Sequence, residues 1–125
     1  MTSKNAEQFE KLIAQYEGIF DIIDGEITVM KEKISIDDFI LLSLIAAYLG
    51  HKLGKFDRET LRVDDILRAG GVACEFSRGS IYNELSTLAG GGKIEREAKG
   101  EYKVTLGRVI QFTNLVLPKL KGEKK

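Results

Sequence analysis

The chain has few of the residues that characterise disulfide-rich or membrane-spanning proteins. It contains one cysteine, one histidine, one proline and no tryptophan. A single thiol cannot close an internal disulfide, and no run of about 20 apolar residues is present to span a bilayer. The polar opening MTSKNAEQFEKL is unlike a secretory signal. We therefore expect a reduced, cytoplasmic protein that does not contact a membrane.

Candidate catalytic and metal-binding residues are equally scarce. Cys74 has no cysteine or histidine partner at metal-ligand spacing, and a structural role near a helix end is expected for His51. The stretch AGGGKI follows an expected helix and has Ile94 where a phosphate-binding loop needs Ser or Thr. The sequence predicts no enzyme activity, no cofactor and no metal.

Net charge is also absent, because nineteen basic residues balance nineteen acidic ones. The distribution is uneven: residues 1–76 carry nine basic and fourteen acidic residues, whereas residues 77–125 carry ten and five. The overall neutrality argues against strong nonspecific binding to nucleic acid. The basic second part is a weak indication of an anionic partner for one face.

Hydrophobic spacing predicts a mainly helical chain. Apolar residues at intervals of three and four predict a first helix that ends near Asp24-Gly25, followed by residues 26–33 as a short strand or an irregular connection. Ser35, with Asp38 three residues later, resembles a capping box and predicts the start of a second helix. Since that helix is apolar on nearly all sides over residues 39–49, we expect it to be the buried centre.

Glycines divide the rest of the chain into short elements. Residues 61–63 alternate as a very short strand, and DDILRAGG, residues 64–71, predicts a short helix. Ser77 is a favourable N-cap for another helix, which three glycines, residues 90–92, end. A last helix follows after residue 106, and Pro118 is expected to end or kink it.

The segment KIEREAKGEYKVTL, residues 93–106, has the pattern of a β-hairpin. Its register follows from the requirement that the two apolar residues near its ends share the buried face. The expected pairs are Ile94 with Val104, Glu95 with Lys103, and Arg96 with Tyr102. They leave residues 98–100 as a loop that ends in a left-handed glycine.

The order of elements divides the chain into three parts. Residues 1–35 are expected to form an N-terminal helical extension, and residues 107–125 a C-terminal helix and charged tail. Between them, residues 36–106 have the element order of a winged helix-turn-helix. The predicted fold is therefore mainly α with a small β-hairpin wing, extended by N- and C-terminal helices.

Two short motifs indicate a family. Gly79-Ser80-Ile81-Tyr82 opens the helix that Ser77 caps, and Tyr102, Val104, Thr105 and Gly107 close the hairpin. This pattern resembles the PadR-like transcriptional regulators, although Asn83 stands where that family often has proline and Leu106 alone separates Thr105 from Gly107. Related winged helices of the MarR or archaeal regulator type share the element order. The resemblance implies a dimeric, sequence-specific DNA-binding regulator.

The helix of residues 77–89 is expected to enter the major groove of double-stranded DNA, while the hairpin contacts the backbone or minor groove. The residues predicted to bind DNA are polar, basic or small: Arg78, Gly79, Ser80, Tyr82, Asn83, Ser86, Arg96, Lys99 and Lys103. Three glutamates of the hairpin, Glu95, Glu97 and Glu101, repel phosphate. One protomer is therefore expected to bind weakly.

Weak binding by one protomer favours a homodimer, whose two helices read sites one DNA turn apart. The apolar stripes of the terminal helices supply the predicted dimerisation residues: Phe9, Leu12, Ile13, Tyr16, Phe20, Val109, Phe112 and Val116. The alternative is that both helices fold back onto their own domain. No residue identifies a small-molecule effector.

A second function stays open at this stage, a winged-helix module that holds a protein partner without binding DNA. A continuous positive surface that joins Arg78, Arg96, Lys99 and Lys103 would favour DNA. Neutralisation of these cations by neighbouring glutamates would favour the protein partner.

Overall fold

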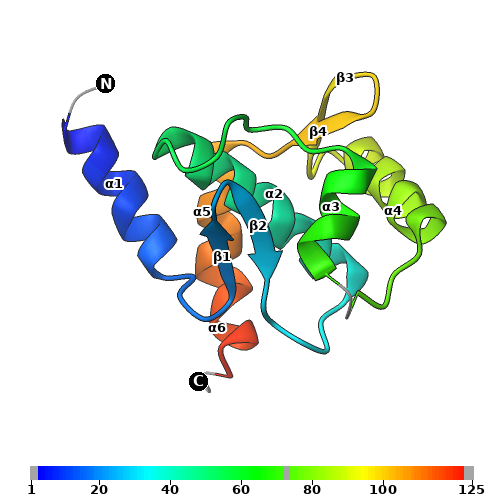
Figure 1. Cartoon of the computed structure of the whole chain (residues 1–125), viewed down its shortest axis with the longest axis horizontal. Coiled ribbons are helices and arrows are strands. Elements are labelled where there is room, and N and C mark those ends of the chain that lie inside the picture. The colour runs from blue at the N-terminus through cyan, green and yellow to red at the C-terminus, as the bar shows by residue number, and fades with distance from the viewer. Residues whose placement is uncertain (1–2, 72–73, 123–125) are drawn as a thin grey trace.

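The helix α2, Ile36–Lys52, runs through the centre of the computed structural model, which describes residues 3–71 and 74–122 (Figure 1). Every residue from Leu42 to Gly50 is buried, as its apolar composition predicts. Ser43 is the polar exception, and its hydroxyl donates to the Phe39 carbonyl at 2.9 Å. The predicted cap is confirmed, because the Asp38 N–H donates to Ser35 Oγ at 3.2 Å.

Two short helices and a hairpin pack against α2. The helices are α3, Val63–Gly70, and α4, Arg78–Gly90, which lie side by side in Figure 1. The hairpin consists of β3, Glu95–Ala98, and β4, Glu101–Lys103. Leu61 forms an isolated β-bridge to β4, because its N–H and carbonyl each bond to Tyr102 at 2.9 Å. The strand predicted over residues 61–63 is limited to this bridge, since α3 already begins at Val63. The mainly helical fold with a small hairpin is confirmed, and its layout is compatible with a winged helix.

The register of the hairpin is largely as predicted. Glu95 pairs with Lys103 and Arg96 with Tyr102, but Ala98 pairs with Glu101, so the loop has two residues rather than three. A bulge at Glu97 takes up the extra residue. Without the bulge, a two-residue loop would place Ile94 and Val104 on opposite faces of the hairpin. With it, both side chains are buried. Gly100 has a φ of +77°, the left-handed conformation expected of it.

The N-terminal segment corrects the prediction of one long helix. The helix α1, Ser3–Ala14, ends early, and two strands follow: β1, Phe20–Ile23, and β2, Glu26–Val29. Asp24 and Gly25, with φ values of 53° and 76°, form the two-residue turn between them. An Asp-Gly pair with β-branched residues close by on both sides, here Ile23 and Ile27, is a strong hairpin signal, and it prevails over the helical spacing of the preceding apolar residues.

The terminal elements join the core of α2. The last helices are α5, Leu106–Leu115, and α6, Leu117–Leu120, and the break between them adjoins Pro118, as predicted. No helix in the described ranges is long and apolar enough to cross a membrane. Residues 123–125 of the expected charged tail lie outside the described residues.

The predicted dimerisation residues are covered by their own chain. Ile13 and Val116 are partly buried, and the other six are buried in the core: Phe9, Leu12, Tyr16, Phe20, Val109 and Phe112. Both terminal segments therefore fold back onto their own domain, which removes their apolar area from water without a second chain. A homodimer stays a prediction, and it would need other surfaces than these.

A buried hydrogen-bond chain joins the two terminal segments. The Thr113 hydroxyl donates to the Val109 carbonyl at 2.7 Å, so the Tyr16 hydroxyl is the donor in its 2.6 Å contact with Thr113 Oγ1. The Tyr16 ring also stacks on Phe20, with centroids 5.0 Å apart. Burial raises the pKa of Tyr16 to about 12, although the hydrogen bond to Thr113 acts in the opposite direction.

Tyr16→Phe is expected to lower the free energy of unfolding by about 1 kcal/mol at neutral pH, because one buried hydrogen bond is lost. The wild-type protein should lose a further 2–3 kcal/mol, roughly, between pH 10 and 12, since tyrosine ionises near 10 in the unfolded chain but stays protonated in the fold. The variant should lose less stability than the wild-type protein over this range, although Tyr48, whose pKa burial also raises, still contributes to the loss. Urea unfolding at pH 8, 10 and 11 measures both effects.

Tyr82→Phe is the matched control, because Tyr82 is exposed on α4. Its unfolding should follow the wild-type protein at every pH. If Tyr16→Phe and the wild-type protein lost stability in parallel above pH 10, the buried hydroxyl would not be the titrating group.

Candidate nucleic-acid interface

The helix α4 has an inner face and an outer face set by local sequence. Ser77 caps it, and the Ser80 N–H donates to Ser77 Oγ at 3.1 Å. Ile81, Leu85 and Leu88 are buried at helical spacing and hold the inner face against the core. Gly91 ends the helix as its C-cap, and Gly92 follows in the left-handed conformation with a φ of +76°. The helix predicted over residues 77–89 thus forms, and it turns the predicted apolar residues toward the core.

All six residues predicted to bind DNA from α4 are exposed: Arg78, Gly79, Ser80, Tyr82, Asn83 and Ser86. A Cβ built on Gly79 would have no atom within 4 Å, so the first turn is open to a close partner. Tyr82 is 55% exposed, which makes it one of the few large apolar side chains at the surface. The outer face therefore consists of short polar side chains around one aromatic ring.

The carboxylate of α4 is turned away from this outer face. Glu84, the acidic residue of the helix, is half-buried beside Asp37 at the start of α2. A hydrogen bond between the two carboxyl groups raises the pKa of Glu84, and partial burial acts in the same direction. The fully exposed residues of α4 consequently include no carboxylate.

Arg78 is paired within the chain. Its guanidinium forms an ion pair with Asp64, the second residue of α3. Both side chains are well exposed, so the pair lies in solvent and contributes little to stability. Its consequence is electrostatic, because a carboxylate lies beside Arg78, the basic residue of α4.

The wing has two free cations and one that is engaged. Arg96 and Lys99 are exposed, and neither forms an ion pair with any described residue. Lys103 is only 21% exposed and binds Glu97 at 2.9 Å and Glu59 at 3.8 Å. The hydrogen bond that the Lys103 ammonium donates to Glu97 is the main reason that the pKa of Lys103 is raised, against the effect of desolvation. Lys103, predicted to contact DNA, is instead part of an ion-pair network.

This network ties the wing to the segment that precedes α3. Glu101 accepts hydrogen bonds from the Arg62 guanidinium at 2.9 Å and from the Thr60 hydroxyl at 3.2 Å. Together with the Lys103–Glu59 pair, these contacts flank the bridge between Leu61 and Tyr102. The continuous positive surface that would favour DNA is therefore absent from the described residues, because Arg78 and Lys103 are both paired.

Asp65 anchors the start of α3. One carboxylate oxygen accepts from the Arg62 N–H at 2.9 Å and lies 3.0 Å from the Arg58 guanidinium, while the other lies 2.7 Å from that of Arg68. Partial burial would raise the pKa of Asp65, but these three donors together lower it. The sequence predicted Asp64 and Asp65 only as helix-start residues. The pairing of Asp65 with Arg68 could have been predicted from the sequence, because the two residues are three apart on one helix. The pairing with Arg58 could not, because Arg58 lies in the loop before the helix.

Cys74 and His51 have local partners. The Cys74 thiol donates to the Phe76 carbonyl with an Sγ–O distance of 3.6 Å, and His51 Nδ1 lies 3.3 Å from the Phe56 carbonyl. Within residues 3–71 and 74–122, no group of three or more His, Cys, Asp or Glu side chains is placed to hold a metal ion.

Comparisons with protein-family models, with curated proteins and with solved structures found no match for this chain.

Asp65→Asn is expected to lower the free energy of unfolding by about 1–3 kcal/mol near neutral pH, because three donors lose a charged acceptor. The pKa of Asp65 is lowered by folding, so its contribution is present above the unfolded value near 4 and is lost as the pH falls through the lower folded value. The wild-type protein should therefore lose more stability than the variant on acidification below about pH 5.

Urea unfolding at pH 7, 5 and 3 tests this expectation, with Asp57→Asn as the control. Asp57 lies in the same loop as Arg58 but is 77% exposed. The control should differ little from the wild-type protein. Equal stabilities of Asp65→Asn and Asp57→Asn at pH 7 would contradict the anchoring role.

Proposed function

We propose that this protein is a DNA-binding regulator that places the outer face of α4 in the major groove of double-stranded DNA. The observation that carries the proposal is the composition of that face: α4 contributes exposed short polar side chains, no fully exposed carboxylate of its own, and an open glycine in the first turn. A major groove admits a helix of this shape, and an asparagine such as Asn83 can bond an adenine edge through two groups. Ser80 and Ser86 are suited to phosphate contacts.

The wing supplies contacts that position the protein without reading bases. Arg96 and Lys99 are free to bind phosphate or to enter the minor groove. Arg78 joins them when a phosphate replaces Asp64 as its partner. With so few cations, one protomer binds weakly, and a homodimer on sites about 34 Å apart supplies the remaining affinity. Such a protein acts in the cytoplasm and resembles the PadR-like regulators in its motifs.

One observation favours a second candidate, a winged-helix module that binds a protein partner. The ion pairs of Arg78 with Asp64 and of Lys103 with Glu97 reduce the positive potential that phosphate requires. The exposed Tyr82 ring suits a protein interface as well as a groove. The two candidates differ in whether the protein binds a bare duplex at low salt.

Fluorescence anisotropy with a labelled mixed-sequence duplex distinguishes them. DNA binding predicts an affinity that falls as salt rises. Lys99→Ala should reduce the slope of the logarithm of the binding constant against the logarithm of the salt concentration by about one. Lys11→Ala, which removes an exposed lysine of α1, is the control and should leave the slope unchanged.

On a selected operator, Asn83→Ala should weaken binding about tenfold, because the two groups that bond an adenine edge are lost. Asn114→Ala, which changes an exposed asparagine of α5, is the control and should leave the affinity unchanged.

Asp64→Asn tests the pairing of Arg78 directly. Removal of this carboxylate frees the guanidinium and lowers repulsion of phosphate, so the variant should bind the duplex about two- to fivefold more tightly than the wild-type protein. Asp57→Asn makes the same change in charge away from α4 and should alter affinity less. Absence of binding at low salt by both the wild-type protein and Asp64→Asn would favour the protein-partner module.

A further inference from the structure

The strand β1 has one edge that no strand covers among the described residues. It pairs only with β2, and Phe20 lies opposite Val29. The Met30 N–H donates to the Ile19 carbonyl at 2.8 Å, which makes Phe20 and Val29 a non-hydrogen-bonded pair. By the alternation of an antiparallel ladder, the main-chain groups of Ile22 also point away from β2.

The outward groups of β1 are satisfied only locally. The Phe20 N–H reaches the Tyr16 carbonyl at 3.3 Å, and the Ile22 N–H donates to the side chain of its own neighbour, Asp21 Oδ1, at 2.8 Å. That contact is exposed to solvent. A backbone donor held by an adjacent exposed carboxylate is readily transferred to a partner's carbonyl, because neither group is buried.

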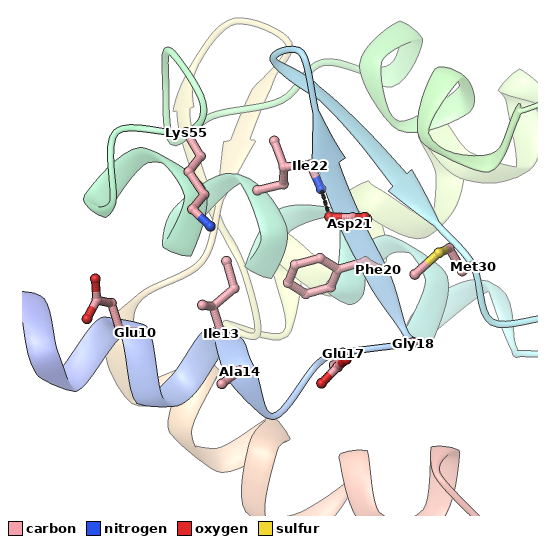
Figure 2. Close-up of a pocket in the computed structure, with 10 residues that line it drawn as sticks. All are labelled: Glu10, Ile13, Ala14, Glu17, Gly18, Phe20, Asp21, Ile22, Met30 and Lys55. Carbon is pink, nitrogen blue, oxygen red and sulfur yellow. Dashed lines mark hydrogen bonds between the residues drawn. The ribbon is translucent and has the colours of Figure 1, made fainter.

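A groove of about 420 Å³ lies along this edge (Figure 2). The helix α1 forms one wall, and Lys55 reaches over the other side. The apolar lining comes from Ile13, Phe20, Ile22 and Met30. Met30 is 43% exposed, although it is a large apolar side chain. The groove thus offers apolar contacts beside an open strand edge.

The rim of the groove is acidic. Glu10, Glu17 and Asp21 line it with three carboxylates, against the single ammonium of Lys55. A second copy of the chain, paired edge to edge through β1, would bring two such sets of carboxylates together, and like charges at an interface are unfavourable. A partner with basic side chains complements the same rim.

We propose that the β1 edge binds an extended segment of another protein, apolar at alternate positions and basic between them. The segment adds a third strand to β1 and β2, places its apolar side chains in the groove, and pairs its lysines or arginines with the rim. This surface lies away from α4 (Figure 1), so the chain can hold this partner and its DNA at the same time. The inference does not depend on DNA binding.

The test uses the full chain and a fluorescently labelled octapeptide of alternating valine and lysine. Two further versions carry N-methyl groups on the valine amides or on the lysine amides, which block opposite edges of an extended peptide. The parent peptide is expected to bind with micromolar affinity at low salt. One N-methylated version should bind about tenfold more weakly and the other nearly as well, because β1 pairs with a single edge.

Charge reversal locates the site. Glu17→Lys should weaken peptide binding about fivefold, whereas Glu75→Lys, an equal change of net charge at an exposed residue just before α4, should leave it within about twofold. Circular dichroism checks that both variants are folded.

Three outcomes would overturn the proposal. They are no binding of the parent peptide at low salt, equal affinities of the two N-methylated peptides, or equal losses in Glu17→Lys and Glu75→Lys. Sedimentation adds a fourth: a dimer of the chain that Met30→Lys dissociates would assign this edge to a second copy.

Discussion

Burial of α2 is the constraint on which the rest of the structure depends. This helix is apolar on nearly all sides, so no single neighbour can cover it, and α1, α3, α4 and both strands of the N-terminal hairpin contact it. Each element needs only one apolar face because α2 supplies the other. Gly50 shows how close the approach is, since a Cβ there would come within 2.5 Å of Ile22 Cδ1. Because β1 covers the part of α2 around Gly50, the burial of α2 fixes the position of β1 and of the groove beside it.

Many charged side chains of this protein form ion pairs within the chain. Asp65 gathers three donors at the start of α3, and Glu101 and Lys103 connect the wing to residues 59–62. The more exposed of these pairs, such as Arg62 with Glu101, add little stability, but they restrict where the short elements lie. They also reduce the number of free cations on the α4 side. If DNA is the partner, shape and hydrogen bonding must contribute more to its recognition than net potential does.

The two proposed surfaces differ in their chemistry. The α4 face is polar and open at a glycine, and its own fully exposed residues include no carboxylate, whereas the β1 edge combines an apolar groove with three carboxylates. The two proposals accordingly assign them partners of opposite charge. This separation matches the uneven distribution of charge along the chain, which is acidic up to residue 76 and basic beyond it.

Local signals in the sequence determined α2, α4, their caps and the pairing of Glu95 with Lys103, because apolar period, capping residues and glycines act over a few residues. The exposed outer face of α4 followed from the same period. The N-terminal hairpin was missed because its apolar residues also fit helical spacing, although the Asp-Gly turn was a local signal. Only the tertiary structure decided that Arg78 meets Asp64, that Lys103 meets Glu59, and that the terminal stripes are buried in their own core. These contacts join segments distant in sequence, so they depend on how the elements pack around α2 and leave no periodic pattern in the chain.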